Sequence, residues 1–167
     1  MRAVGIAGLL LWAAPVPAAD AAPEAASLEA AFHTCVGMKD HPIAGALMRA
    51  VGDAGARDAF VSRHAATVAE LSVERSPGYT TLTARLAGRV SIAGAPVSAI
   101  YAATCEQGCP LAIWGLELDS LSAAQRNGLE RWVRDAPTTD SGSRGPVKVQ
   151  LNTTTDGATV LVCDLSG

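Results

Sequence analysis

Hydrophobic positions in the first half of the chain recur at helical spacing. Apolar residues at positions 28, 32 and 36 lie four apart, and Ser27 precedes them as a suitable N-cap. Pro42 suits the first turn of a further helix. A second apolar stripe follows it: Ile43, Leu47 and Val51. A shorter helical pattern covers 58–64, so we expect two or three short helices packed together.

After about residue 67 the spacing of apolar residues changes from helical to alternating, which is typical of strands. Turn residues at 76–78 and 93–96 separate the strand-like runs, and Gly88 marks a bulge within one of them. The predicted strands lie around residues 71–73, 82–92, 97–104 and 111–118. Because the connections are short, we expect these four strands to form an antiparallel meander.

The clearest helix follows the meander. The residues from Leu121 to Gln125 form a capping box, in which the Ser122 hydroxyl and the Gln125 side chain each satisfy a backbone N–H. Ala136-Pro137 ends this helix. Beyond it, Asp156-Gly157 joins two alternating runs and predicts a C-terminal hairpin with a type I′ turn.

The order of these elements predicts an α+β fold. We expect an antiparallel sheet of about six strands, made of the four-strand meander and the C-terminal hairpin. This sheet packs against the N-terminal helices and the one capped helix. Residues 28–167 are expected to form a single α+β domain, a length that buries about 70% of the surface of the unfolded chain.

The first residues have the features of an export signal. Arg2 precedes an apolar run that ends near Ala14, too short to cross a bilayer at about 20 residues. Small residues at 16–18 or 19–21 supply a cleavage pattern. We therefore predict a signal peptide over 1–21 and a disordered leader over 22–27.

Composition and charge narrow the classes of partner. The net charge is −3 and the chain has no run of Lys or Arg, so no nucleic-acid partner is expected. No later apolar stretch reaches transmembrane length, so no stable membrane insertion of the mature chain is expected. The alanine-rich sequence, with 3 Trp, 2 Tyr and 2 Phe, is typical of a bacterial source of high GC content. We expect a periplasmic or extracellular location.

The four cysteines favour disulfides over metal ligands, because their number is even and export is predicted. We favour Cys105–Cys109 across a tight turn, and Cys35–Cys163 between the helical start and the last strand. Crossed pairing, with Cys35 bonded to Cys109 and Cys105 bonded to Cys163, is the alternative.

The run Cys105-Glu-Gln-Gly-Cys109-Pro110 resembles the CxxxCP motif of Sco-type copper-binding, thioredoxin-like proteins. That resemblance implies copper held by Cys105 and Cys109 together with a distant histidine. In the family the motif opens a helix and the histidine lies downstream. Here a strand-like run follows the motif, and His33, His41 and His64 all lie upstream.

Other chemistry is sparse. The run from His33 to His41 also contains Cys35 and Met38, but one helix cannot present all four as metal ligands. No motif of a serine hydrolase, zinc protease, phosphate-binding loop or dinucleotide site occurs. Glu117 and Asp119 are interpreted as surface charges beside a helix start. We expect no catalytic residue, metal or cofactor.

The turn between the two central strands is a candidate interaction surface, formed by Tyr101, Glu106, Gln107 and Trp114. A pairing centred on this turn puts Tyr101 opposite residue 113, with Trp114 near it and one of the two aromatic side chains exposed.

Our leading hypothesis is a small exported, disulfide-stabilised protein that binds a protein partner, as an inhibitor or immunity-type factor does, without catalysis of its own. The alternative is a periplasmic thiol-redox or copper-handling protein that uses Cys105 and Cys109. A small hydrolase without a recognisable motif is the third hypothesis.

Overall fold

A computed structural model describes residues 21–105, 112–140 and 145–165. Its helices are α1 (Ala21–Thr34), the short 3-10 helix η1 (Val36–Lys39), α2 (Pro42–Val51), α3 (Ala54–Arg63) and α4 (Ala123–Asp135). Its strands are β1 (Val68–Ser76), β2 (Tyr79–Ile92), β3 (Ala95–Cys105), β4 (Ile113–Leu118), β5 (Thr139–Asp140), β6 (Pro146–Val147), β7 (Gln150–Thr153) and β8 (Thr159–Asp164). The predicted signal peptide falls almost wholly outside the described residues.

Six of the strands form one antiparallel sheet in the order β1-β2-β3-β4-β8-β7. The four-strand meander and the C-terminal hairpin are therefore confirmed, and β8 joins the hairpin to the meander by pairing with β4. The pairing of β2 with β3 changes register between Arg85 and Val90. This irregular stretch contains Gly88, where a bulge was predicted. The short strands β5 and β6 pair separately.

The cap of α2 and the cap of α4 follow from local sequence. Nδ1 of His41 accepts a hydrogen bond from the Ala44 amide at 3.3 Å, and Pro42 occupies the first turn of α2. Ser122 and Gln125 form the predicted capping box at the start of α4. The apolar stripe predicted for α2 is buried: Ile43, Leu47 and Val51.

Helix α1 begins earlier than the sequence pattern predicted. It starts at Ala21, whereas the pattern placed the N-cap at Ser27 and a disordered leader over 22–27. Pro23 is compatible with the first turn of a helix, and the residues after it are mostly Ala and Glu, which favour helix. Intrinsic helix preference therefore extends α1 to the N-terminal side of Leu28, which is buried.

The C-terminal hairpin is confirmed, but its predicted type I′ turn is wrong. Within this turn Gly157 has a positive φ, at 87°, whereas Asp156 does not, and the Gly157 amide donates to the Thr154 carbonyl at 2.9 Å. The Thr154 hydroxyl also donates to the Asp156 carboxylate. These bonds favour a type I turn followed by a left-handed glycine, as in longer hairpin loops.

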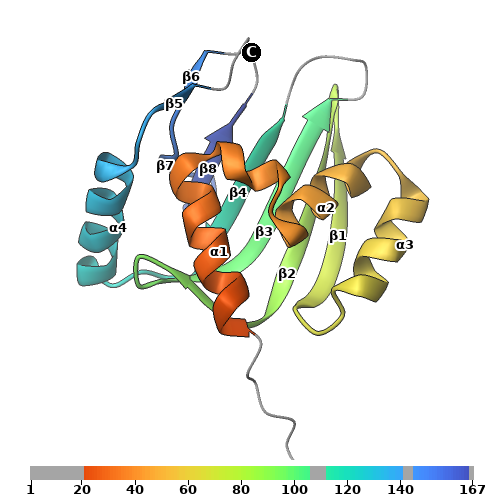
Figure 1. Cartoon of the computed structure of the whole chain (residues 1–167), viewed down its shortest axis with the longest axis horizontal. Helices are drawn as coiled ribbons and strands as arrows, with labels where there is room; N and C mark the ends of the chain where they lie inside the picture. Colours follow the sequence, from red (N-terminus) through yellow and green to blue (C-terminus); the bar gives the residue numbers. More distant parts are fainter. Residues whose placement is uncertain (1–20, 106–111, 141–144, 166–167) are drawn as a thin grey trace, which may run out of the picture.

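The helices form a layer on one face of the main sheet. Helices α1 and α2 cross the front of the sheet in Figure 1, with α3 on the right and α4 on the left. The His33 ring of α1 lies 4.8 Å from the Trp132 ring of α4, which joins these two helices. Sheet residues buried beneath this layer include Leu82, Ile100, Leu116 and Leu161.

Two long-range contacts fix the helical layer to the sheet. The Cys35–Cys163 disulfide joins the end of α1 to β8, with Cα atoms 5.4 Å apart and a sequence separation of 128. Beside it, the Trp114 indole N–H donates to the Ala44 carbonyl of α2 at 3.0 Å. Trp114 and Cys163 are direct cross-strand partners, so both contacts act at one place on the sheet.

No helix in the described part of the chain is long and apolar enough to cross a membrane.

Replacing Cys35 and Cys163 together by alanine should lower the free energy of unfolding by about 4 kcal/mol, because the bond closes a very long loop. Urea denaturation followed by circular dichroism measures this change. The matched control replaces Cys105 and Cys109, whose predicted bond closes a loop of a few residues and should contribute about 2 kcal/mol. Equal losses in the two variants would contradict this ranking.

Trp114→Phe should cost about 1–3 kcal/mol, because the aromatic ring stays and the hydrogen bond to the Ala44 carbonyl is lost. Trp132→Phe on the half-buried face of α4 is the control, and it should cost less. The same urea titration compares the two variants. A larger loss for Trp132→Phe would show that Trp114 does not anchor α2.

Candidate functional site

The candidate site is the face of the main sheet opposite to the helices, which we call the outer face. Side chains alternate between the two faces of a strand, so the neighbours of buried Trp114 and Leu116 point to the outer face. The strand registers define its central residues as Tyr101, Ala99 and Ala103 of β3, Ile113, Gly115 and Glu117 of β4, and Val160 and Val162 of β8.

Small and apolar residues form the centre of the outer face. Ala99, Ala103 and Val160 are buried, although none of them lies beneath the helical layer. Their larger neighbours Tyr101 and Val162 are half-buried and shield them. The centre of the outer face is therefore largely apolar and still contacts solvent.

Tyr101 dominates this surface because it lies over a glycine. Tyr101 pairs directly with Gly115, and a Cβ atom at Gly115 would fall 1.9 Å from Cζ of the Tyr101 ring. The ring therefore occupies the space that any other residue at position 115 would fill. Glycine inside a strand often marks such a close approach.

Glu117 is the charged neighbour of this ring. It lies two residues beyond Gly115 on the same strand, so its side chain points to the same face. Burial, and then the Glu117 carboxylate, raise the pKa of Tyr101 above the ordinary value of 10.0. The Tyr101 hydroxyl is thus neutral at physiological pH and lies close to a carboxylate.

The charges around the outer face are mostly negative. The registers place four carboxylates and one guanidinium there, which gives a net charge of −3: Glu70, Glu74, Glu117, Asp164 and Arg85. Arg85 forms an ion pair with Glu70 at 3.7 Å, and both side chains are more than 60% exposed. Such an exposed pair contributes little to stability.

The structure separates the four residues that the sequence suggested as an interaction surface. Tyr101 lies on the outer face, but Trp114 is buried on the helix side, so its inclusion was wrong. Glu106 and Gln107 lie outside the described residues. The predicted pairing of Tyr101 with residue 113 was also wrong, because Tyr101 pairs with Gly115 and Ile113 pairs with Ala103. Because Gly115 has no side chain, it leaves room for the Tyr101 ring, and this favours the observed register.

Of the two expected disulfides, Cys35–Cys163 is confirmed, which excludes the crossed pairing. Cys105 is the last residue of β3, and the chain returns as antiparallel β4. Cys109 lies outside the described residues, so the Cys105–Cys109 bond stays a prediction.

The four candidate metal ligands between His33 and His41 point to different places. Cys35 is bonded to Cys163, and Met38 is fully buried in the core. The His33 ring packs on Trp132, and His41 caps α2 through Nδ1. Each side chain thus has its own structural contact, and the run does not converge on one point.

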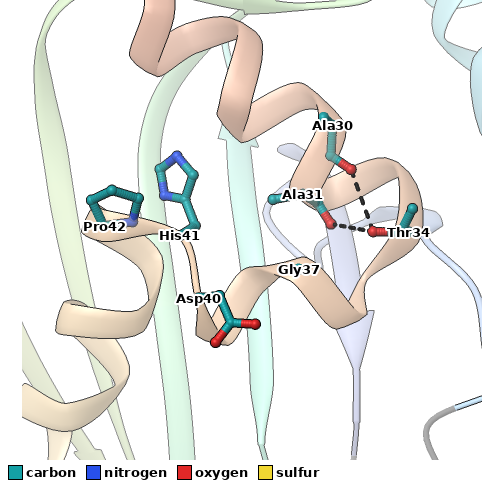
Figure 2. A pocket seen from close by; sticks show the side chains of 7 residues that line it. All are labelled: Ala30, Ala31, Thr34, Gly37, Asp40, His41 and Pro42. Carbon is teal, nitrogen blue, oxygen red and sulfur yellow. Dashed lines mark hydrogen bonds between the residues drawn. The ribbon is translucent and has the colours of Figure 1, made fainter.

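A shallow depression of about 370 Å³ lies where α1, η1 and α2 meet. Figure 2 shows that the Asp40 carboxylate and the His41 ring point in different directions from the same segment. The Thr34 hydroxyl donates to the carbonyls of Ala30 and Ala31 within its own helix. The Thr34 hydroxyl and the His41 ring therefore bond to the local backbone, and the Asp40 carboxylate points elsewhere, so these groups do not converge on a shared point.

A second cleft, of about 270 Å³, has Arg57 and Arg75 in its wall. The Arg57 guanidinium donates to the carbonyls of Ala50 and Val51, at 3.0 Å and 2.6 Å. Carbonyls at the end of a helix lack partners within the helix, so Arg57 acts as a cap for α2.

Comparison with protein-family models, curated proteins and solved structures gives no match.

The sequence did contain a signal for the outer face. Gly115 interrupts an otherwise apolar strand, which is typical of a position where another group approaches the backbone. The alternation of strands β3 and β4 also gives two apolar faces, and the helices can cover only one of them. This argument would have selected Tyr101 and Gly115 and left Trp114 in the core.

The raised pKa of Tyr101 is directly measurable. In a Tyr79→Phe background, Tyr101 is the only tyrosine, and absorbance at 295 nm should report ionisation above pH 10. Glu117→Gln should lower this pKa, yet leave it above the ordinary value, because burial is the larger cause. A midpoint at the ordinary value before the Glu117 substitution would contradict the observed packing.

The raised pKa of Tyr101 also predicts that the stability of the fold depends on pH. A phenol whose pKa is raised by folding binds its proton more tightly in the folded state, so it stabilises the fold below the pKa of the unfolded chain. That stability is lost as the pH rises above 10 and through the folded pKa. Gly115→Ala should displace the ring and reduce both effects, which urea titrations at pH 8 and pH 11 can measure.

Proposed function

We propose that this chain is a small exported protein that binds another protein through its outer face, as an inhibitor or immunity-type factor does, without catalysis of its own. The observation that carries the proposal is the solvent-contacting apolar centre formed by Tyr101, Ile113 and Val162 over Gly115. Aromatic residues in a shielded apolar centre with a charged rim are typical of protein interfaces.

The support beneath this surface also favours binding. The strands that carry Tyr101 and Gly115 place Ile100, Trp114 and Leu116 into the core on their other side. A surface held by core packing loses little conformational freedom when a partner binds, and this increases affinity. The Cys35–Cys163 bond strengthens the same layer and suits an oxidising compartment outside the cytoplasm.

The competing hypothesis is a thiol-redox or copper-handling function of Cys105 and Cys109. In Sco-type proteins the cysteine motif opens a helix. In this chain β3 ends at Cys105 and the next described element is β4, antiparallel to it. This arrangement favours a bond that closes a turn between strands over a reactive centre.

Affinity capture tests the proposal. The mature chain, immobilised through its C-terminus, should retain one stoichiometric protein from a periplasmic extract of the producing organism. Val162→Glu places a charge in the apolar centre and should weaken capture at least tenfold. Arg131→Glu, on the exposed side of α4, should leave capture unchanged.

Three results would count against this proposal. The first is that the unmodified chain retains no protein, and the second is that Arg131→Glu weakens capture as much as Val162→Glu. The third is a readily reducible Cys105–Cys109 bond with stoichiometric copper uptake after reduction, which would support the redox hypothesis instead.

A further inference from the structure

The chemistry of the outer face indicates which kind of partner it suits. This inference rests on the proposed function and concerns the same surface. Its starting point is the Tyr101 ring, which lies on Gly115 and is half-buried. The tip of the ring lies against the backbone at Gly115, and because the residue is only half-buried, part of the ring contacts solvent.

Glu117 and this ring form a pair of groups that attract cations. An aromatic face binds a Lys ammonium or an Arg guanidinium within about 6 Å of its centre. The Glu117 carboxylate lies on the same face of the same strand as Gly115, and it is close enough to the Tyr101 hydroxyl to affect its ionisation. A cation over the ring would therefore also gain a carboxylate partner.

The charges over the rest of the outer face also favour a cationic partner. Among the described residues that the strand registers place on this face, four carboxylates exceed one guanidinium, and this guanidinium of Arg85 is paired with Glu70. Electrostatic complementarity between partners gives specificity and faster association. A nucleic acid or an acidic protein would be repelled by this face, and so would a second copy of the chain placed face to face.

We propose that the outer face binds a basic protein segment, one of whose Lys or Arg side chains lies over the Tyr101 ring and pairs with Glu117. Apolar residues that flank this cation in the partner would pack on Ile113 and Val162, which lie on the β4 and β8 sides of the ring. The site thus combines one charged anchor with an apolar surround.

The probe for this inference is a 14-residue amphipathic peptide of Leu and Lys, compared with the same peptide carrying Glu in place of Lys. Titration into the 15N-labelled mature chain at 150 mM salt should shift amide signals at 99–103, 113–117 and 160–164 with the Lys peptide. The Glu peptide should bind at least tenfold more weakly.

Two variants test the anchor itself. Glu117→Gln and Tyr101→Leu should each lower the affinity for the Lys peptide about three- to fivefold, the range for one exposed cation–π contact or ion pair. Glu117→Gln removes a charge without removing a buried group, so it remains informative if Tyr101→Leu fails to fold. Glu130→Gln on the exposed side of α4 is the control, and it should leave the affinity unchanged.

The inference is overturned if the Lys peptide shifts signals mainly on the helices, if the Glu peptide binds as tightly as the Lys peptide, or if Glu117→Gln binds the Lys peptide like the unmodified chain.

Capture of the natural partner separates this inference from the proposed function. A partner retained equally by the unmodified chain, Glu117→Gln and Tyr101→Leu, yet lost with Val162→Glu, would overturn the basic anchor and leave the protein-binding function intact. Failure of the unmodified chain to retain any partner would overturn the protein-binding function itself.

Discussion

The Cys35–Cys163 bond, together with the Trp114 hydrogen bond beside it, holds the helices against one face of the sheet. Cys35 has a φ of 61°, a conformation that residues other than glycine seldom adopt, so its position between α1 and η1 depends on surrounding contacts. The bond fixes this junction to β8, and the indole fixes α2 to β4. With both contacts on one face, the described helices cover that face of the sheet and not the other.

The outer face owes its character to this one-sided packing. In a fold made of one sheet and one layer of helices, the open face of the sheet normally carries polar residues, as β1 and β2 do with Glu70, Ser72 and Thr83. The central strands differ, because β3, β4 and β8 present apolar residues there as well. The absence of a side chain at Gly115 leaves room for the Tyr101 ring, and this gives the face an aromatic centre with carboxylates on β1, β4 and β8.

The features that could be predicted from the sequence are those that depend on residues close together along the chain. Caps and turns depend on a few neighbouring residues, so the Ser122–Gln125 box and the strand order of the meander were foreseeable. The register of β3 against β4 depends on how Tyr101 packs across the sheet, and turn length alone does not specify it. Which of Tyr101 and Trp114 is exposed was left open for a related reason, since the hydrogen bond that holds the Trp114 indole in the core joins it to Ala44, 70 positions away. Long-range packing of this kind leaves little trace in a single sequence.

The central claim is that the outer face contacts a protein partner in the compartment where this chain acts. A photo-crosslinking amino acid at position 83, across the strand from Tyr101, tests this in intact cells, with position 130 on α4 as the comparison. The account predicts one crosslinked protein from position 83 and none from position 130. Crosslinks from position 130 alone, or from neither position, would contradict it.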